Sequence, residues 1–140
     1  MKECPTSNFW PYGLLRAPGY TGITDIEKDA GRVEETFLSR KVIYVFPVTE
    51  NDPNASDMDR GCNAEAQGAG RLDRAINYFQ YLHRTHRKSF ATQLVISPAK
   101  SMNGGTGFFS ECAIESVFDT LSGCMPLDPD HLAPVATPSQ

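Results

Sequence analysis

The alternation of apolar and polar residues along the chain predicts three helices. In residues 29–40, Val33 and Phe37 lie one helical turn apart. Over residues 70–86 the apolar positions recur at helical spacing; they are Leu72, Ala75, Ile76, Phe79 and Leu82. A third helix is expected after a glycine-rich stretch, and its apolar positions are Ile114, Val117, Phe118 and Leu121. Each helix thus has one apolar stripe that can pack on a sheet.

Two short runs predict β-strands. Residues 42–46 read Val-Ile-Tyr-Val-Phe, an uninterrupted run that is typical of a strand covered on both faces. Residues 93–96, Gln-Leu-Val-Ile, form the second strand. Helices and strands alternate, which predicts an α/β fold with a parallel sheet. Two strands alone leave both edges of a sheet open, so the pattern is typical of the trailing part of a larger sheet.

The two ends of the chain differ in composition from its middle. Residues 1–28 contain six proline and glycine residues, with Phe9, Trp10, Tyr12 and Tyr20 among them. This combination predicts an irregular but ordered loop whose aromatic side chains hold it to a surface. Residues 126–140 contain four prolines and are expected to be a flexible tail. We therefore predict one folded portion over residues 1–125, followed by that tail.

Composition narrows the classes of partner. The 13 Lys and Arg residues against 17 Asp and Glu residues give a formal net charge of −4, which argues against nucleic acid as a partner. No apolar run approaches the roughly 20 residues that span a bilayer. The first six residues have no apolar h-region, so neither a membrane span nor a signal peptide is predicted.

An acidic loop begins like an EF-hand calcium site, with Asp52, Asn54 and Ser56. Its sixth and twelfth positions are Asp57 and Asn63, where such a site needs Gly and Glu. A solvated loop with Asx turns is therefore the preferred interpretation.

Two further stretches suggest ligands only weakly. His83 and His86 lie three residues apart, but no further residue completes a zinc site with them. They belong to a basic cluster over residues 83–88, which could bind an anion but is expected to complement the carbonyl end of a helix dipole. The glycine-rich stretch over 103–107 lacks the Lys-Ser/Thr of a P-loop, so a turn is expected. We predict no metal and no cofactor.

The four cysteines are Cys4, Cys62, Cys112 and Cys124. None forms a C-x-x-C pair, which excludes zinc-ribbon and thioredoxin motifs. Four cysteines allow three disulfide connectivities, and their spacing chooses neither among these nor between bridges and buried thiols.

The chain contains no nucleophile motif of a serine hydrolase. Such an enzyme of α/β architecture places its serine in G-x-S-x-G, because neighbouring side chains would clash at the sharp turn. That motif does not occur here, and Ser101 lies between Lys100 and Met102.

Four motifs, in order along the chain, resemble those of a group of largely uncharacterised proteins with the α/β-hydrolase fold. Residues 4–14 resemble C-P-x-Y-N-x-W-x-Y-G-L, and residues 42–53 resemble V-x-Y-L-L-G-x-x-D-T-D-P. Residues 57–74 resemble D-L-D-x-S-C-A-A-x-A-Q-G-x-x-R-x-x-R, and residues 97–112 resemble V-P-G-V-G-H-D-x-x-x-M-F-x-S-x-C. The resemblance covers about residues 4–119 and is to the C-terminal part of those proteins.

The resemblance implies what has become of the catalytic positions. In those proteins the nucleophilic serine lies in an earlier half that has no counterpart here. Their acid position falls on Glu50, and Glu can replace Asp in this fold. Their base position falls on Met102, whose thioether can neither accept nor donate the proton. The implied fold is an incomplete α/β-hydrolase-like sheet, and the implied function is a truncated or degenerate hydrolase without activity of its own.

The same resemblance implies a disulfide. Cys62 and Cys112 both lie in matched motifs, each near the start of an expected helix, so they are the preferred pair. Such a bond would tie the helix over 70–86 to the last helix.

Two other functions stay open. The chain could be a binding module whose open sheet edge recruits a partner or a second copy, because unpaired edges favour strand addition. It could also be one subunit of a carboxylic-ester hydrolase that another chain, such as the missing N-terminal half, completes. In that case His131 is the histidine available after the glycine-rich stretch.

Overall fold

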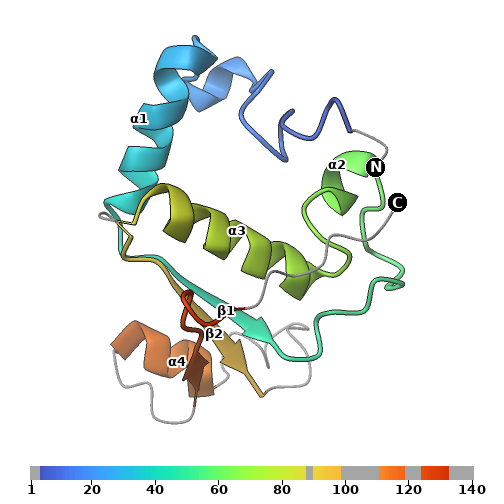
Figure 1. The fold of residues 1–140 in the computed structure, drawn as a ribbon, viewed down its shortest axis with the longest axis vertical. Coiled ribbons are helices and arrows are strands. Elements are labelled where there is room, and N and C mark those ends of the chain that lie inside the picture. The colour runs from blue at the N-terminus through green and yellow to red at the C-terminus, as the bar shows by residue number, and fades with distance from the viewer. Residues whose placement is uncertain (1–3, 88–89, 99–110, 119–123, 133–140) are drawn as a thin grey trace.

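The structure is a computed structural model that describes residues 4–87, 90–98, 111–118 and 124–132. Within these residues the chain forms a small α/β arrangement of four α-helices, one short 3₁₀ helix and a sheet (Figure 1). In chain order the elements are η1 (Gly19–Thr21), α1 (Ile26–Leu38), β1 (Ile43–Pro47), α2 (Cys62–Glu65), α3 (Arg71–Thr85), β2 (Gln93–Ser97), α4 (Glu111–Phe118) and β3 (Met125–Pro126).

The sheet has the strand order β1-β2-β3. Strands β1 and β2 are parallel, with Tyr44 opposite Leu94, so the expected parallel pair is confirmed. Strand β3 is antiparallel to β2 and places Pro126 opposite Val95. The expectation of two open edges is therefore wrong at β2, whose second edge is covered. A two-residue strand is too short to produce a period-two pattern, and proline is tolerated on an edge strand.

The predicted boundary between folded portion and tail falls inside β3. Leu127 also donates its backbone N–H to the carbonyl of Leu94 at 2.8 Å, so the sheet pairing extends past residue 126. Residues 133–140 of the expected tail lie outside the described residues.

The helices agree with the periodicity to differing degrees. Helix α3 matches the prediction over 70–86 within one residue at each end. Helix α1 begins three residues before the predicted start, because the Asp29 carboxylate accepts the backbone N–H groups of Thr24 and Asp25 at 2.8 and 3.0 Å. These backbone hydrogen bonds hold the pKa of Asp29 far below its usual range. Helix α2 was not predicted, since four residues carry no periodic signal.

Figure 1 shows the helices on both sides of the sheet. Helix α3 crosses one face, helix α4 lies against the other, and α1 with the N-terminal segment lies beyond α3. Strand β1 is half-buried at four positions and buried at Pro47, so the expected cover on both faces is only partial. No helix in the described ranges has the length and hydropathy needed to cross a bilayer.

The core lies on both faces of β2. Leu94 and Val95 are fully buried, as are Phe79 and Leu82 from α3. Val95 belongs to a buried cluster with Cys112 and Cys124, against which Ile43 and Val45 of β1 pack. The sheet is thus held between α3 and the α4–β3 segment.

Helix α4 directs its apolar side chains outward. The expected helix is present, but Ile114, Val117 and Phe118 are 46%, 77% and 70% exposed and do not form its buried face. Leu121, the fourth expected apolar position, lies outside the described residues. The face that is buried instead carries Cys112, Glu115 and Ser116. Cys112 is covalently bonded to Cys124, and this bond fixes that face of the helix toward the sheet.

The disulfides join Cys4 to Cys62 and Cys112 to Cys124. The preferred Cys62–Cys112 pair is therefore wrong. Cys62 begins α2, near the N-terminal segment, whereas Cys112 lies in α4 on the opposite face of the sheet (Figure 1). Cα separations of 5.8 and 5.4 Å in the observed pairs are those that a disulfide requires.

Candidate functional site

The carboxyl end of β1 is the place where an open α/β sheet ordinarily binds its ligand. The chain leaves the strand after Pro47, and the Glu50 carbonyl accepts the backbone N–H of Leu72 at 3.0 Å. This bond brings the first turn of α3 beside the loop that follows β1. The side chains of the loop and of α3 can therefore act together.

A three-residue ion network lies at this position. Arg71 donates from Nη1 to Oε2 of Glu50 at 3.0 Å, and its Nη2 lies 2.8 Å from Oδ1 of Asp57. The hydrogen bond with Arg71 lowers the pKa of the Asp57 carboxyl, and the same bond raises the pKa of Arg71. Glu50 is 23% exposed, so the contact with Arg71 is partly shielded from solvent.

Glu50 thus lies at the end of β1, where the resemblance predicts the acid of a catalytic triad. Such an acid accepts the N–H of a histidine and stabilises the imidazolium that forms. In this structure its Oε2 instead accepts a hydrogen bond from the Arg71 guanidinium. The arrangement can link the β1 loop to α3 electrostatically.

The same loop caps α3. Asn51 accepts the backbone N–H of Asp73 at 3.2 Å and donates to the Asp73 carboxylate at 3.0 Å. Asp73 in turn accepts the backbone N–H of Gly70 at 3.3 Å. A Cβ at position 70 would displace the Asn51 amide oxygen from its capping position and would lie 3.0 Å from the Asn51 carbonyl oxygen, so glycine allows this cap. Asn51 supplies the capping oxygen that Gly70 cannot supply.

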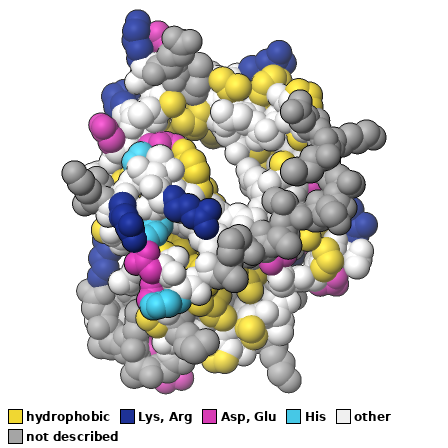
Figure 2. Space-filling view, in the orientation of Figure 1, with side chains coloured by type: hydrophobic (Ala, Val, Ile, Leu, Met, Phe, Trp, Pro, Cys, Tyr) yellow, Lys and Arg dark blue, Asp and Glu magenta, His cyan; other side chains and the backbone are white. Residues whose placement is uncertain are grey.

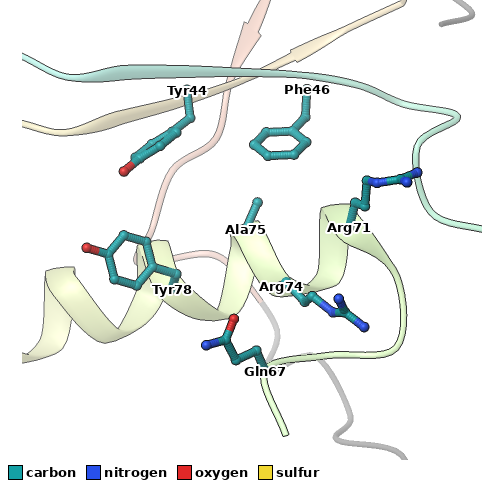
Figure 3. Close-up of a pocket in the computed structure, with 7 residues that line it drawn as sticks. All are labelled: Tyr44, Phe46, Gln67, Arg71, Arg74, Ala75 and Tyr78. Atoms are coloured by element: carbon teal, nitrogen blue, oxygen red, sulfur yellow. The ribbon is translucent and has the colours of Figure 1, made fainter. Parts of the chain in front are cut away.

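A pocket of about 370 Å³ lies between β1 and α3 (Figure 3). Its walls are aromatic at one end and polar at the other; the residues are Tyr44, Phe46, Gln67, Arg71, Arg74, Ala75 and Tyr78. Tyr44 and Tyr78 meet edge to face with ring centroids 6.4 Å apart. Burial raises the pKa of Tyr78 to about 12, so its hydroxyl stays protonated at neutral pH.

The polar end of this pocket is held by Arg74. Its Nε donates to the Gly68 carbonyl at 2.8 Å, and its Nη2 donates to the Asp59 carbonyl at 2.8 Å. Gly68 has a φ of +148°, and a Cβ there would lie 2.8 Å from the backbone nitrogen of Arg74. The turn between α2 and α3 therefore requires glycine at position 68.

A larger cavity of about 780 Å³ lies between the N-terminal segment, α1 and α3, and Figure 2 shows the hollow on this face. We call it the aromatic groove. Its lining residues come from three parts of the chain: Asn8, Trp10, Pro11, Tyr12, Gly13 and Leu14; Ala30, Val33, Glu34 and Phe37; and Gln67, Tyr78 and Tyr81.

The N-terminal wall of the groove is fastened by polar and covalent bonds. Gln67 donates from Nε2 to the Tyr12 carbonyl at 2.9 Å, and the Tyr12 hydroxyl donates to Asp59. Cys4 is bonded to Cys62 in the same region. The predicted anchoring by aromatic side chains holds only in part, because Trp10 is 40% exposed and Tyr20 is 83% exposed.

Glu34 is held by two partners at the groove. Its Oε1 accepts the Tyr81 hydroxyl at 2.9 Å, and its Oε2 lies 2.8 Å from Nε2 of His86. The hydrogen bond to Glu34 raises the pKa of Tyr81.

The two candidate zinc histidines have separate partners. His86 pairs with Glu34, whereas His83 packs edge to face on Phe90 and lies 3.9 Å from Asp130. Across the described ranges, no group of three or more His, Cys, Asp or Glu side chains is placed to hold a metal ion. The basic cluster does lie at the end of α3, and Arg87 of that cluster pairs with Asp130 at 2.9 Å.

The remaining candidates have local roles or lie outside the described residues. Asn54 donates its backbone N–H to the Asp52 side chain at 2.8 Å, which confirms the expected Asx turn. His131 pairs with Asp128 at 2.6 Å on the surface. Ser101, Met102 and the glycine-rich stretch fall outside the described ranges, so the assignment of Met102 to the base position stays a prediction.

Comparison of the chain with protein-family models, with curated protein sequences and with solved structures finds no match in any of the three.

Sequence reasoning missed the residues that give this region its charge. Arg71 and Arg74 lie three residues apart on α3, a spacing that places both on one face and that could have indicated a shared role. Tyr78 and Tyr81 have the same spacing and form part of the groove. The groove as a whole has no sequence signal, because its walls are far apart in the chain.

Proposed function

We propose that this chain is a degenerate α/β-hydrolase-like scaffold that does not hydrolyse esters on its own. The observation that supports this proposal is the contact between Glu50 and Arg71 at 3.0 Å. The residue at the implied acid position serves to join the β1 loop to α3.

The chemistry of the contact supports this role. A triad acid acts through the hydrogen bond that it accepts from histidine and through its negative charge. A guanidinium at hydrogen-bond distance balances that charge and uses one of the carboxylate lone pairs. The described histidines have other carboxylate neighbours, namely Asp130 for His83, Glu34 for His86 and Asp128 for His131.

Hydrolysis of short p-nitrophenyl esters tests the proposal. We expect no turnover above buffer for the wild-type chain or for Glu50→Gln, while Glu50→Gln lowers the free energy of unfolding by about 1 kcal/mol through loss of the ion pair. Asp52→Asn removes a neighbouring charge from the same loop and serves as the matched control. Wild-type turnover that Glu50→Gln abolishes without loss of folding would contradict the proposal.

One observation favours a second function, a module that pairs its free sheet edge with a second copy. Val42 accepts the N–H of Gln93, and Val48 donates to Ser97, so the even-numbered peptide groups of β1 point toward β2. Those of Ile43 and Val45 point to the opposite edge, where the described residues include no further strand. Such an edge can pair with the same strand of another molecule.

Size-exclusion chromatography with light scattering tests this second function. A concentration-dependent dimer that Val45→Pro abolishes supports it, because proline removes the outward N–H while leaving the pairing to β2 intact. A wild-type chain that stays monomeric up to high concentration contradicts it.

A further inference from the structure

The aromatic groove has no part in the functions proposed above. It is open to solvent and has a volume of about 780 Å³, within the range of small-molecule sites. Its walls combine exposed aromatic rings with one acidic side chain, so the chemistry of these walls indicates what it can bind.

The charged side chain that lines the groove is acidic. Glu34 is the single charged side chain among the described residues that line it. The tyrosines on its walls are neutral, because burial raises the pKa of Tyr78 and the hydrogen bond to Glu34 raises that of Tyr81. Within the described part of the chain, the lining thus has an acidic side chain and no Lys or Arg, and His86, which pairs with Glu34, is not among the lining residues, so the groove favours a cation over an anion.

The aromatic rings reinforce this preference. Tyr78 and Tyr81 lie nearly parallel, with an interplanar angle of 21° and ring centroids 6.4 Å apart, and Phe37 lies 6.4 Å from Tyr78. Trp10 stands on the N-terminal wall and is 40% exposed. The faces of such rings carry the negative part of the quadrupole and attract cations.

The polar groups of the groove are already engaged. Both carboxylate oxygens of Glu34 have partners, in Tyr81 and His86, and Gln67 donates to the Tyr12 carbonyl. A primary ammonium or a sugar loses hydrogen bonds to water when it binds and must form new ones with the protein. The polar side chains of the groove offer few such hydrogen bonds, because they already have partners. A quaternary ammonium has no N–H group, so it needs only the charge and the ring faces.

We propose that the aromatic groove binds a small molecule with a trimethylammonium group, of the choline class. The cation lies over the ring faces of Tyr78 and Tyr81 with the Glu34 charge nearby, and Trp10 closes the opposite side.

Trp10 provides the readout, because it is the one tryptophan of the chain. The full-length oxidised protein is titrated at pH 8 with choline chloride, at constant ionic strength, and its fluorescence is followed. The controls are 3,3-dimethylbutan-1-ol, which has the same shape without the charge, and ethanolamine, which has the charge without the methyl groups. We expect saturation with choline and binding at least about tenfold weaker for both controls.

Equal affinity for the uncharged alcohol overturns the proposal, because the groove would then be only a hydrophobic cavity. Absence of saturation with choline up to roughly 0.1 M, in fluorescence and in calorimetry, also overturns it.

Two variants locate the site. Glu34→Gln keeps an acceptor for Tyr81 but removes the charge, and we expect choline binding to weaken about tenfold; Glu35→Gln, next to it on α1 and outside the groove, is the control. Tyr78→Leu keeps an apolar side chain but removes a ring, with a similar loss; Phe118→Leu removes an exposed ring from α4 and is its control. Unchanged choline affinity in both folded groove variants contradicts the assignment.

Discussion

The regions held by the two disulfides are built in opposite ways. Cys4 and Cys62 are 58 residues apart in sequence, and the contacts around their bond are polar, such as the Thr6 hydroxyl on Asn63 at 2.5 Å. Cys112 and Cys124 are only 12 residues apart and are buried beside Val95 in an apolar cluster.

This difference indicates how each region keeps its place. The N-terminal segment adds little apolar burial, so its position on α2 and α3 depends on a covalent bond and on hydrogen bonds such as that from Gln67 to Tyr12. The α4–β3 segment contributes buried residues to the sheet core, and its disulfide closes a short loop. The long disulfide should therefore matter more for stability and for the aromatic groove.

Removal of the long disulfide should give the largest effect. In the Cys4→Ala/Cys62→Ala variant, the entropy regained by an unfolded chain with a 58-residue separation predicts a loss of about 4 kcal/mol in the free energy of unfolding. Denaturant unfolding measures this loss, and Trp10 emission should shift to longer wavelength as the groove wall detaches. A loss below about 1 kcal/mol would mean that the hydrogen bonds alone hold the N-terminal segment in place.

Removal of the Cys112–Cys124 disulfide should lower the free energy of unfolding by less than removal of the long disulfide, and the aromatic groove should stay intact. For Cys112→Ala/Cys124→Ala the 12-residue separation predicts about 3 kcal/mol. We expect the Trp10 emission of the folded variant to stay as in the wild type. A Trp10 shift equal to that of the first variant would contradict the separation of the two regions.

Substitution of Gly68 tests the turn between α2 and α3, which also carries Gln67 of the aromatic groove. Gly68→Ala should lower the free energy of unfolding by about 2 kcal/mol, because its φ is +148° and the new Cβ would meet the backbone of Arg74. Gly31→Ala is the control, since open space surrounds this α1 residue and alanine should stabilise the helix by about 1 kcal/mol. In thermal unfolding, the midpoint temperature should fall for Gly68→Ala and rise for Gly31→Ala.

The smallest expected effect is the loss of stability at alkaline pH, when Tyr78 ionises. The pKa of Tyr78 is raised to about 12, above the usual value near 10, so the folded chain holds a proton that the unfolded chain releases between these values. Its contribution to stability is complete below pH 10 and is lost as the pH rises toward 12. Denaturant unfolding over this interval should show a shallower decline for Tyr78→Phe. A parallel decline in both chains would contradict the assignment to Tyr78.

The long regular elements could be predicted from the sequence. Helix α3 has five apolar residues at helical spacing, and its ends were predicted within one residue. Strands β1 and β2 were predicted because β-branched and aromatic runs are distinctive. Helix α2 and strand β3 were missed, because two to four residues carry no periodicity.

Features that depend on contacts across the chain could not be predicted. The position of Glu50 at the end of β1 followed from the motif, but its pairing with Arg71 depends on how α3 docks. The disulfide pairing was wrong because the sheet separates Cys62 from Cys112, a fact that motif positions do not contain. The same holds for the groove, which three distant segments form.

The orientation of α4, whose apolar side chains face solvent, has a consequence for the redox behaviour of the chain. With the Cys112–Cys124 bond closed, the helix is oriented against its own hydrophobic preference, with Val117 and Phe118 in water. A reductant breaks this bond, and the orientation of α4 then depends on the packing of its buried face, which carries Cys112, Glu115 and Ser116. The redox state of the chain thus decides whether a covalent bond holds the exposed apolar face of α4 toward solvent.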